Sequence, residues 1–456
     1  MCPSDQNQAV LLGDLLLVYP DYTVSNRRTF VVLHRHSSRW FITNRTGVEI
    51  CRVLAETGSR RTAADLLVRK YGLSTKAAVR DVRPLAEFTQ PFLASPGSET
   101  ERQPCLNSLF LHLTSRCNLS CVHCYAEAGT ARPADLSFHL VLDLIGQLKQ
   151  AGGHSLTLSG GEPLCYPKIE AVVEHACSQI PLVQLLTNAT LVTRSTASAL
   201  AHANLEVQVS IDGDGATSHD RIRGSGSFER AMAGLAVWIE TLGPQKVTLC
   251  ATTMRGNLSS LPGLVELATR LGVARMRLLP LRSAGRASTR DQRPDADEYR
   301  SFLDSLLTRQ ITGDRSLDLS CGVSGLLLDV GPDCSDDTWC PVGRKIVVSA
   351  GGDAFPCVLL MHPRFRLGNV SRTSLLELLG TEPMRECCRA VIQRRQRIPE
   401  CAGCAWQNLC QGGCMGHALE EKGTIWATDQ FCAFRAAWYP RMFNLLLDSS
   451  TRVNRV

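Results

Sequence analysis

Long apolar runs are missing from this chain. No segment approaches the roughly 20 consecutive apolar residues that cross a bilayer. The opening residues, Met1-Cys2-Pro3-Ser4-Asp5-Gln6, do not form the basic segment followed by an apolar one that marks a secretory signal. These absences argue against a membrane protein and against a secreted one. We expect a soluble, cytoplasmic protein with no membrane partner.

A strong charge bias is also missing. The 456 residues carry a net charge of only +6, and a short basic cluster such as the four arginines between 389 and 397 usually forms a solvated helix face. We therefore expect no nucleic acid partner. The length exceeds that of one domain and predicts two or three compact units.

Cysteine is what the sequence has in excess, with 20 residues. In a chain of this size without a signal peptide, such thiols are kept reduced and indicate metal binding or redox chemistry. Three of them, Cys117, Cys121 and Cys124, have the spacing C-x3-C-x2-C. A closed 4Fe-4S cube or a structural zinc takes four ligands, so three thiolates leave one iron open. The spacing therefore predicts a catalytic metal site.

This spacing closely resembles that of the radical S-adenosylmethionine (SAM) enzymes. The resemblance is strengthened by Gly160-Gly161-Glu162, which ends a predicted strand. It implies that the cluster binds SAM, that the Gly-Gly-Glu segment holds the methionine amine, and that SAM cleavage yields a 5′-deoxyadenosyl radical. Paired glycines allow close backbone approach, and a carboxylate accepts hydrogen bonds from an ammonium group.

Two further segments match the same family. The stretch Val209-Ser210-Ile211-Asp212-Gly213 resembles its Ser-Ile-Asp-Gly motif, which makes Ser210 and Asp212 candidate SAM contacts; simple capping of a strand end is the alternative. Thr187-Asn188-Ala189-Thr190 resembles Thr-Asn-Gly-Thr, but Ala189 stands where the family usually has glycine. This departure bears on the local backbone geometry.

Apolar strand-like runs alternate with helical stretches between residues 108 and 315. The predicted strands are 109–113, 155–158, 183–186, 205–211, 246–252 and 275–281, and such alternation indicates parallel βαβ units. The resemblance makes this α/β region an open (β/α)6 partial TIM barrel. The three-cysteine motif follows the first strand, at the end of the barrel where catalysis takes place.

A second cysteine array lies in a predicted domain at 316–440, which is followed by a tail at 441–456. It resembles the seven-cysteine SPASM pattern, and its members are Cys340, Cys357, Cys401, Cys404, Cys410, Cys414 and Cys432. The resemblance implies two auxiliary 4Fe-4S clusters, three clusters in all. Cys340, Cys357 and Cys414 would bind the first auxiliary cluster, and the other four cysteines would saturate the second. Zinc is the alternative for the C-x2-C pair.

The fourth ligand of the first auxiliary cluster is open in the sequence. Cys334 is favoured and Cys321 is its rival; without either, an open iron would be left for the substrate. The catalytic residue is unknown, because no Asp, Glu or His outside the SAM motifs stands apart. Cys165, two residues after Pro163, is a candidate hydrogen donor or relay. The remaining cysteines are expected to be small buried hydrophobic residues.

The first 92 residues predict three strands followed by three helices, a winged-helix-like outline. The expected strands are 11–19, 29–34 and 40–43, and the expected helices begin near Asn44, Thr62 and Ser74 and end near 56, 70 and 88. Segments 44–50, 71–73 and 81–82 resemble the PqqD-like peptide chaperone of pyrroloquinoline quinone biosynthesis. That family implies a leader-peptide recognition domain; a purely structural helical domain is the alternative. A polar hinge would follow within the linker 93–107.

Together these resemblances imply a radical SAM oxidoreductase that matures a ribosomally synthesised peptide (RiPP) through a thioether or carbon-carbon crosslink. Its partners would be a precursor peptide with a leader segment and an electron donor such as flavodoxin or ferredoxin. The alternatives are an enzyme of haem-type or quinone cofactor biosynthesis, a sulfatase-type protein maturase, and a non-catalytic iron-sulfur protein. The peptide and the choice between crosslinking, epimerisation and decarboxylation stay open.

Overall fold

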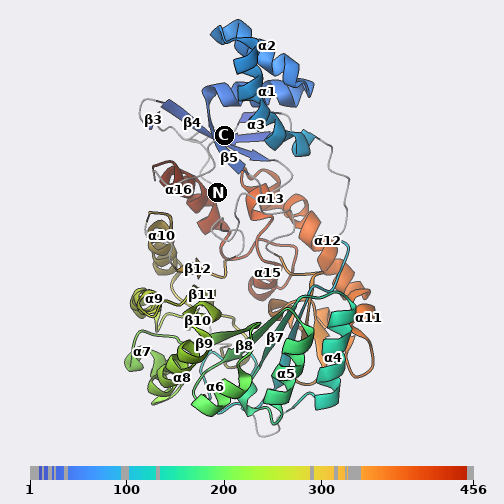
Figure 1. Ribbon diagram of the computed structural model, residues 1–456, viewed down its shortest axis with the longest axis vertical. Helices are drawn as coiled ribbons and strands as arrows, with labels where there is room; N and C mark the ends of the chain where they lie inside the picture. Colours follow the sequence, from blue (N-terminus) through green and yellow to red (C-terminus); the bar gives the residue numbers. More distant parts are fainter. Residues whose placement is uncertain are drawn as a thin grey trace.

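A computed structural model describes residues 10–12, 15–18, 23–24, 27–34, 40–93, 102–129, 134–287, 292–312, 317–323, 326 and 340–448. Cys334 and the predicted hinge at 94–101 lie outside the described residues. Figure 1 shows an N-terminal unit at one end of the molecule, a barrel region at the other, and a C-terminal helical region between them. None of the helices in the described ranges is long and apolar enough to cross a membrane.

The N-terminal unit combines an antiparallel sheet with three helices. Its strands are β1 (Val10–Leu12), β2 (Leu15–Val18), β3 (Thr23–Val24), β4 (Arg27–His34) and β5 (Trp40–Asn44), in the order β1-β2-β4-β3, with β5 also paired to β4. The helices are α1 (Arg45–Thr57), α2 (Arg60–Tyr71) and α3 (Thr75–Leu93). As predicted, Asn44 caps α1 by accepting the Gly47 N–H at 2.9 Å. This unit has a hydrophobic core of its own.

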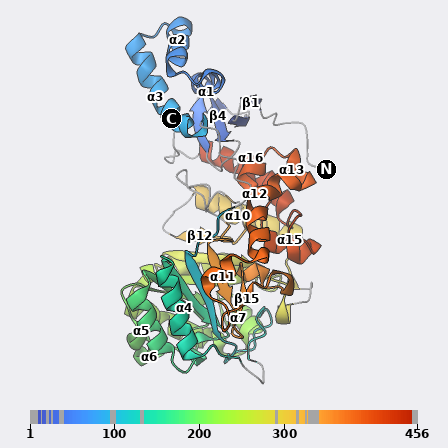
Figure 2. The same ribbon diagram turned by 90° about the vertical axis from the view of Figure 1, so that its right-hand side faces the viewer.

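The barrel region contains the six predicted parallel strands. They are β6 (Ser108–Thr114), β7 (Ser155–Gly160), β8 (Leu182–Thr187), β9 (Leu205–Ser210), β10 (Val247–Thr253) and β11 (Arg275–Pro280). They are joined by α4 (Phe138–Gln150), α5 (Ile169–Gln179), α6 (Arg194–Leu200), α7 (Ala216–Arg223), α8 (Ser227–Leu242) and α9 (Leu261–Arg270). The α/β partial barrel is thereby confirmed, and Figure 2 shows α4, α5 and α6 stacked along its outer face.

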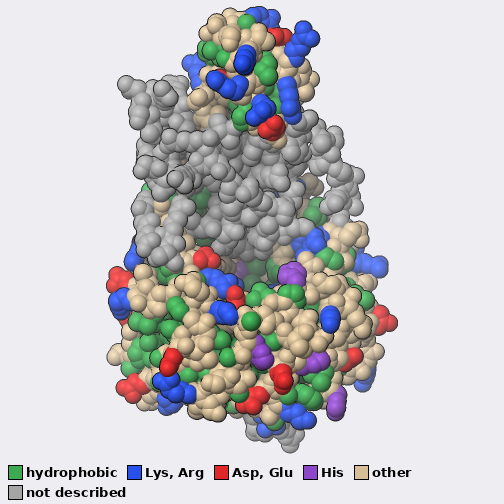
Figure 3. Space-filling view, viewed as in Figure 1, with side chains coloured by type: hydrophobic (Ala, Val, Ile, Leu, Met, Phe, Trp, Pro, Cys, Tyr) green, Lys and Arg blue, Asp and Glu red, His purple; other side chains and the backbone are tan. Residues whose placement is uncertain are grey.

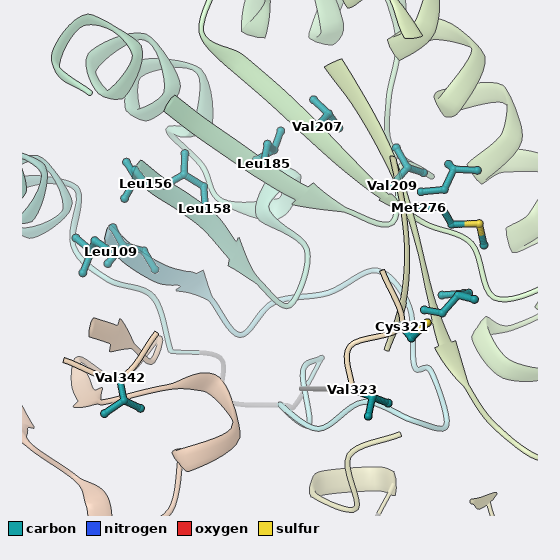
Figure 4. Packing of buried hydrophobic residues seen from close by; sticks show 14 of the residues in the cluster. Leu109, Leu156, Leu158, Leu185, Val207, Val209, Met276, Cys321, Val323 and Val342 are labelled. Atoms are coloured by element: carbon teal, nitrogen blue, oxygen red, sulfur yellow. The ribbon is translucent and has the colours of Figure 1, made fainter. Parts of the chain in front are cut away.

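Alternating side chains divide the barrel into an outer core and an inner surface. Leu156 and Leu158 on β7, for example, are fully buried under the helices, and Figure 4 shows them packed in line with their neighbours on adjacent strands. Each fully buried leucine contributes about 1.5–3 kcal/mol of transfer free energy. This core holds the strands in register, so that their carboxyl ends meet at one rim of the barrel.

The C-terminal region extends the same sheet at both edges. Strand β12 (Asp318–Ser320) pairs with β11, while β13 (Lys345–Val348) pairs in parallel with β6 and leads into β14 (Asp353–Phe355) and β15 (Gly368–Asn369). The sheet of the described residues therefore has ten strands. One continuous core joins the barrel to this region, which places the second cysteine array directly against the barrel.

Helices complete the C-terminal region. They are α10 (Ala296–Thr312), α11 (Leu375–Leu379), α12 (Glu382–Arg397), α13 (Pro399–Ala402), α14 (Gln407–Cys410), α15 (Met415–Lys422) and α16 (Cys432–Asp448). Helix α16 runs past residue 440, where the sequence predicts a tail. Residues 102–107, expected in the linker, pack against the chain before β13: the Arg102 guanidinium donates to the Cys340 carbonyl at 2.6 Å, and Leu106 is buried.

Candidate functional site

The loop after β6 carries the three thiols of the first motif. Burial raises the pKa of the Cys117 thiol to about 12, although the Leu119 N–H, which donates to its sulfur at 3.5 Å, opposes this shift. The thiols of Cys121 and Cys124 lie close enough for their charges to raise the pKa of Cys117 as well, so the three are within electrostatic range of one another. A cluster binds thiolates, so its assembly here would release protons.

Arg286 fixes the shape of this loop from the strand end opposite. Its Nε donates to the Cys121 carbonyl at 2.9 Å, and its Nη1 donates to the Ala128 carbonyl at 2.8 Å. The backbone of Gly285 approaches so closely that a Cβ there would lie 2.5 Å from the Cys124 oxygen. These residues were not predicted from the sequence, because no motif marks them.

Gly160 and Gly161 bring the end of β7 against the thiol-bearing loop. Two backbone N–H groups make the contact: that of Gly161 donates to the Thr114 carbonyl at 2.7 Å, and that of Glu162 donates to the Arg116 carbonyl at 2.8 Å. A Cβ on Gly161 would lie 2.1 Å from the Arg116 oxygen. The glycines thus allow the close approach of two backbone segments.

The Glu162 carboxylate lies fully buried beneath the rim. Burial raises its pKa, and hydrogen bonds from the Asn188 N–H at 2.7 Å, the Thr187 hydroxyl at 2.7 Å and the Leu164 N–H at 3.2 Å oppose this shift. These donors take up most of the acceptor capacity of the carboxylate. Glu162 therefore anchors the end of β8, and its contact with the amine of SAM stays a prediction.

Ala189 adopts the left-handed backbone conformation that the family's glycine would favour, with φ of 59°. The turn around it reaches the thiol-bearing loop through side chains. Asn188 Nδ2 donates to Asn118 Oδ1 at 3.0 Å, and Asn118 Nδ2 donates to the Thr190 hydroxyl at 2.7 Å. This network holds the ends of β6 and β8 together despite the departure from glycine.

Asp212 is fully buried and ion-paired. Burial opposes its charge, but the Arg223 guanidinium, whose Nε donates to Oδ2 at 2.6 Å, outweighs burial and lowers the pKa of the carboxyl. Oδ1 accepts the Thr252 N–H at 2.8 Å, and His123 Nε2 lies 3.5 Å from Oδ2. The carboxylate of Asp212 is thus occupied by contacts with protein groups. Ser210, the other predicted SAM contact on this segment, lies half-buried opposite Cys250 of β10.

These residues fit a cluster with SAM. Arg223 lies within electrostatic range of Cys121, so a buried cation faces the negative charge of a thiolate-bound cluster. His123 Nδ1 and His219 Nε2 are buried there without hydrogen-bond partners among the described residues. Within those residues no three His, Cys, Asp or Glu side chains converge on a point that would hold one metal ion. A cube does not need such convergence, because each thiolate binds its own iron.

The seven C-terminal cysteines fall into two sets, according to which thiols raise one another's pKa. Around Cys414, whose pKa burial raises to about 12, lie Cys340 and Cys357. Around Cys401, whose pKa burial also raises to about 12, lie Cys404, Cys410 and Cys432. We call these the first and the second auxiliary set. Their members are the cysteines that the SPASM resemblance implies for the first and the second auxiliary cluster, and the binding of clusters there stays a prediction.

A further thiol, that of Cys387, lies beside the first auxiliary set. Cys387 of α12 is fully buried within electrostatic range of Cys340 and Cys357, and burial raises the pKa of its thiol. Cys321, the rival ligand in the sequence analysis, is buried near Tyr299. Cys387 has no motif around it, and only the fold brings it to this place.

Two buried arginines lie between the auxiliary sets. Arg394 and Arg435 are each 1% exposed, and Asp429 at 3% is the carboxylate that pairs with Arg435. Two guanidinium groups and one carboxylate leave a net positive charge in a dry interior, which is costly unless further negative charge compensates it. Thiolate-ligated clusters supply such charge, so this environment fits iron-sulfur clusters.

A polar group connects the thiol-bearing loop with the first auxiliary set. The Tyr125 hydroxyl lies 3.3 Å from His112 Nε2, and the Arg282 guanidinium lies 4.9 Å from the centre of the Tyr125 ring. Burial raises the pKa of Tyr125 to about 12, and Cys124 and Cys357 both lie within its electrostatic range. Cys165 lies half-buried at the Glu162 turn, where burial raises the pKa of its thiol.

Comparisons with known proteins agree with this geometry. The radical SAM superfamily model matches residues 111–260, and that of the SPASM iron-sulfur cluster-binding domain matches residues 340–405. The mycofactocin maturase MftC of Mycobacterium tuberculosis is 31% identical over 313 residues, which cover 66% of this chain and 76% of that protein. The pre-heme d1 synthase of Dinoroseobacter shibae is 31% identical over 361 residues, covering 72% of this chain and 86% of that protein.

The fold is also similar to that of a solved structure. Streptococcus suis SuiB, bound to its precursor peptide SuiA, has a TM-score of 0.59 at 14% identity, and the match covers 94% of this chain and all of that one. The family models and the relatives agree on one kind of enzyme, with SAM and iron-sulfur clusters as cofactors. The chain belongs to the radical SAM superfamily and is a SPASM-domain enzyme of that superfamily.

Proposed function

We propose that this enzyme matures a ribosomally synthesised peptide by oxidising it to a thioether or carbon-carbon crosslink. The observation that carries the proposal is the N-terminal unit, a sheet and three helices with a core separate from the barrel. A SAM-cleaving barrel with auxiliary clusters needs no such unit for the chemistry itself. MftC is named as a maturase, and SuiB was solved with a precursor peptide, which supports a peptide as the substrate.

The N-terminal unit would capture the leader segment. Strand β1 has one strand neighbour, β2, within the described part of the sheet, so a leader would add as a further strand at this edge. The helices α1, α2 and α3 carry nine Lys and Arg against five Asp and Glu, and Figure 3 shows basic side chains across their visible face. We infer a leader of acidic character.

The protein's own residues would hold and orient the reactants. Cys117, Cys121 and Cys124 would bind the first cluster, and Gly160, Gly161 and Ser210 would hold SAM beside it. When bound, and reduced by a flavodoxin or ferredoxin, the cluster and SAM would supply the radical chemistry that removes hydrogen from the peptide. Arg286, Glu162 and Asp212 would keep the loop, the strand ends and Arg223 in place. The thiols of the two auxiliary sets would bind clusters that accept the electron released on crosslinking.

The test is mass spectrometry of a precursor peptide encoded by a neighbouring reading frame, after incubation with reconstituted enzyme, SAM and reductant. A crosslink predicts the loss of two hydrogens. The matched control replaces Cys117, Cys121 and Cys124 by alanine, which should leave peptide binding intact and abolish the mass change. No mass change in the peptide treated with the unaltered enzyme would favour epimerisation. Failure of the peptide to bind at all would overturn the proposal.

Cofactor biosynthesis is a second candidate, favoured by one observation. The match to the pre-heme d1 synthase covers a larger share of that relative than the match to MftC does of the maturase. The two functions separate in a binding experiment with the full chain. A fluorescent precursor peptide should bind the maturase and be displaced by its free leader segment. A tetrapyrrole that binds and is consumed, while the peptide does not bind, would favour the cofactor enzyme.

A further inference from the structure

Arg435 and Asp429 form an ion pair that is almost completely buried. Neither side chain has appreciable contact with solvent. Arg435 Nη2 donates to Asp429 Oδ1 at 2.5 Å, and Nη1 donates to Oδ2 at 3.3 Å. Two parallel hydrogen bonds fix the orientation of both groups. The pair therefore presents a positive end and a negative end in fixed directions.

The two ends contact ligands of different auxiliary sets. At the positive end, Arg435 Nε donates to the Cys410 sulfur at 3.1 Å, in the second set. At the negative end, Asp429 Oδ2 accepts the Cys414 N–H at 2.7 Å, in the first set. Gly413 makes room for this arrangement, because a Cβ there would lie 2.3 Å from Arg435 Nη2.

We propose that the Arg435–Asp429 pair sets the order of the two auxiliary reduction potentials, making the second cluster the better electron acceptor. A cationic N–H donor at a cluster sulfur stabilises the added electron and raises the potential, whereas a nearby carboxylate lowers it. Both effects are strong in a water-free interior. The inference rests on the proposed function through its assignment of two clusters to these thiols.

The step that the pair biases is a transfer of one electron. The reduced first cluster loses the electron and the oxidised second cluster gains it, while no bond forms or breaks and no proton moves. Cys357 of the first set lies within electrostatic range of Tyr125, next to Cys124. Figures 1 and 2 show α13 and α16, which carry members of the second set, on the side away from α4, α5 and α6. The bias therefore draws electrons away from the barrel.

The test is a reductive titration of the auxiliary clusters followed by electron paramagnetic resonance. It uses the full chain with Cys117, Cys121 and Cys124 replaced by alanine, reconstituted anaerobically; additional replacement of Cys401 identifies the signal of the second cluster. The second cluster should be reduced first. The double variant R435Q/D429N keeps hydrogen-bonding groups and removes both charges, so the equilibrium constant for electron transfer to the second cluster should fall at least tenfold, or about 59 mV.

Arg372 is exposed on the same domain, and R372Q is the matched control that should leave the constant unchanged. If the double variant loses iron, D429N alone keeps an acceptor for the Cys414 N–H and should still lower the constant. Earlier reduction of the first cluster, an unchanged constant in an iron-replete variant, or assembly of only one auxiliary cluster would overturn the proposal. No peptide is present, so a failure of peptide maturation leaves this result unaffected.

Discussion

Replacing Gly161 by alanine should displace the loop that carries the SAM-site thiols. The added Cβ would lie 2.1 Å from the Arg116 oxygen, 2.8 Å from the carbonyl carbon and 2.9 Å from the Ala128 Cβ. The carbonyl group belongs to the backbone directly before Cys117, so it cannot rotate away as a side chain would. Its movement would also break the hydrogen bond that it accepts from the Glu162 N–H at 2.8 Å.

The cost follows from these two effects. Overpacking of a tight site costs about 1–3 kcal/mol, and leaving a buried backbone group without its partner costs about 1–3 kcal/mol. We expect G161A to lose about 2–6 kcal/mol of stability, concentrated at the thiol-bearing loop. In Gly146 of α4 a Cβ would meet nothing within 4 Å, so G146A should gain up to about 1 kcal/mol from helix propensity.

The assays are equilibrium dialysis of SAM against the reconstituted enzyme and thermal loss of its iron-sulfur absorbance. For G161A we predict at least a tenfold weaker affinity for SAM and an earlier thermal transition, since about 1.4 kcal/mol corresponds to a factor of ten. G146A should match the unaltered protein in SAM affinity. Normal SAM affinity, iron content and thermal transition in G161A would show that the thiol-bearing loop does not depend on this close backbone approach.

Two further predictions concern stability. Gly413 and Gly423 share a φ of 71°, but only at Gly413 would a Cβ collide with the buried ion pair. G423A therefore isolates the backbone strain, about 1–2 kcal/mol, and G413A should lower the thermal transition temperature well below that of G423A. Equal transition temperatures in the two variants would contradict this prediction. Burial lowers the pKa of His112 and His219 to about 4, below the value of about 6.5 in the unfolded chain. Between these pH values the unfolded chain binds more protons than the folded one. The free energy of unfolding should therefore fall as the pH drops from about 6.5 to about 4. H219Q should flatten this pH dependence, whereas H139Q, at an exposed position, should not; urea unfolding across the pH range measures both.

The sequence predicts the barrel strands closely because their signal is local. Each predicted strand begins and ends within two residues of its observed bounds, as β6 (Ser108–Thr114) illustrates. The continuation of the sheet was missed because β13 has only four residues, Lys345–Val348, and pairs with β6 more than 200 positions earlier. Strands this short carry little periodicity, and such distant pairing leaves no pattern in a single sequence.

The same distinction between local and tertiary signals applies to the candidate site. Cysteine spacing marks the thiols, because ligand geometry imposes it on nearby residues. The surrounding charges depend on tertiary packing, so Arg223, Arg286 and Asp429 could not be identified from spacing. One signal was available for Arg435: it stands alone among apolar residues in Cys432-Ala433-Phe434-Arg435-Ala436-Ala437-Trp438, and a charge in such a run is rarely buried without a partner.

Cleavage of SAM by the fully loaded enzyme is the direct test that Cys117, Cys121 and Cys124 hold a catalytic cluster. The protein is reconstituted anaerobically with iron and sulfide, reduced with dithionite, and incubated with SAM, and 5′-deoxyadenosine is measured by liquid chromatography and mass spectrometry. The unaltered chain should yield 5′-deoxyadenosine, and a variant in which alanine replaces Cys117, Cys121 and Cys124 but the auxiliary clusters still assemble should yield none. Absence of 5′-deoxyadenosine from the fully loaded, fully reduced protein would exclude a SAM-cleaving cluster at these cysteines.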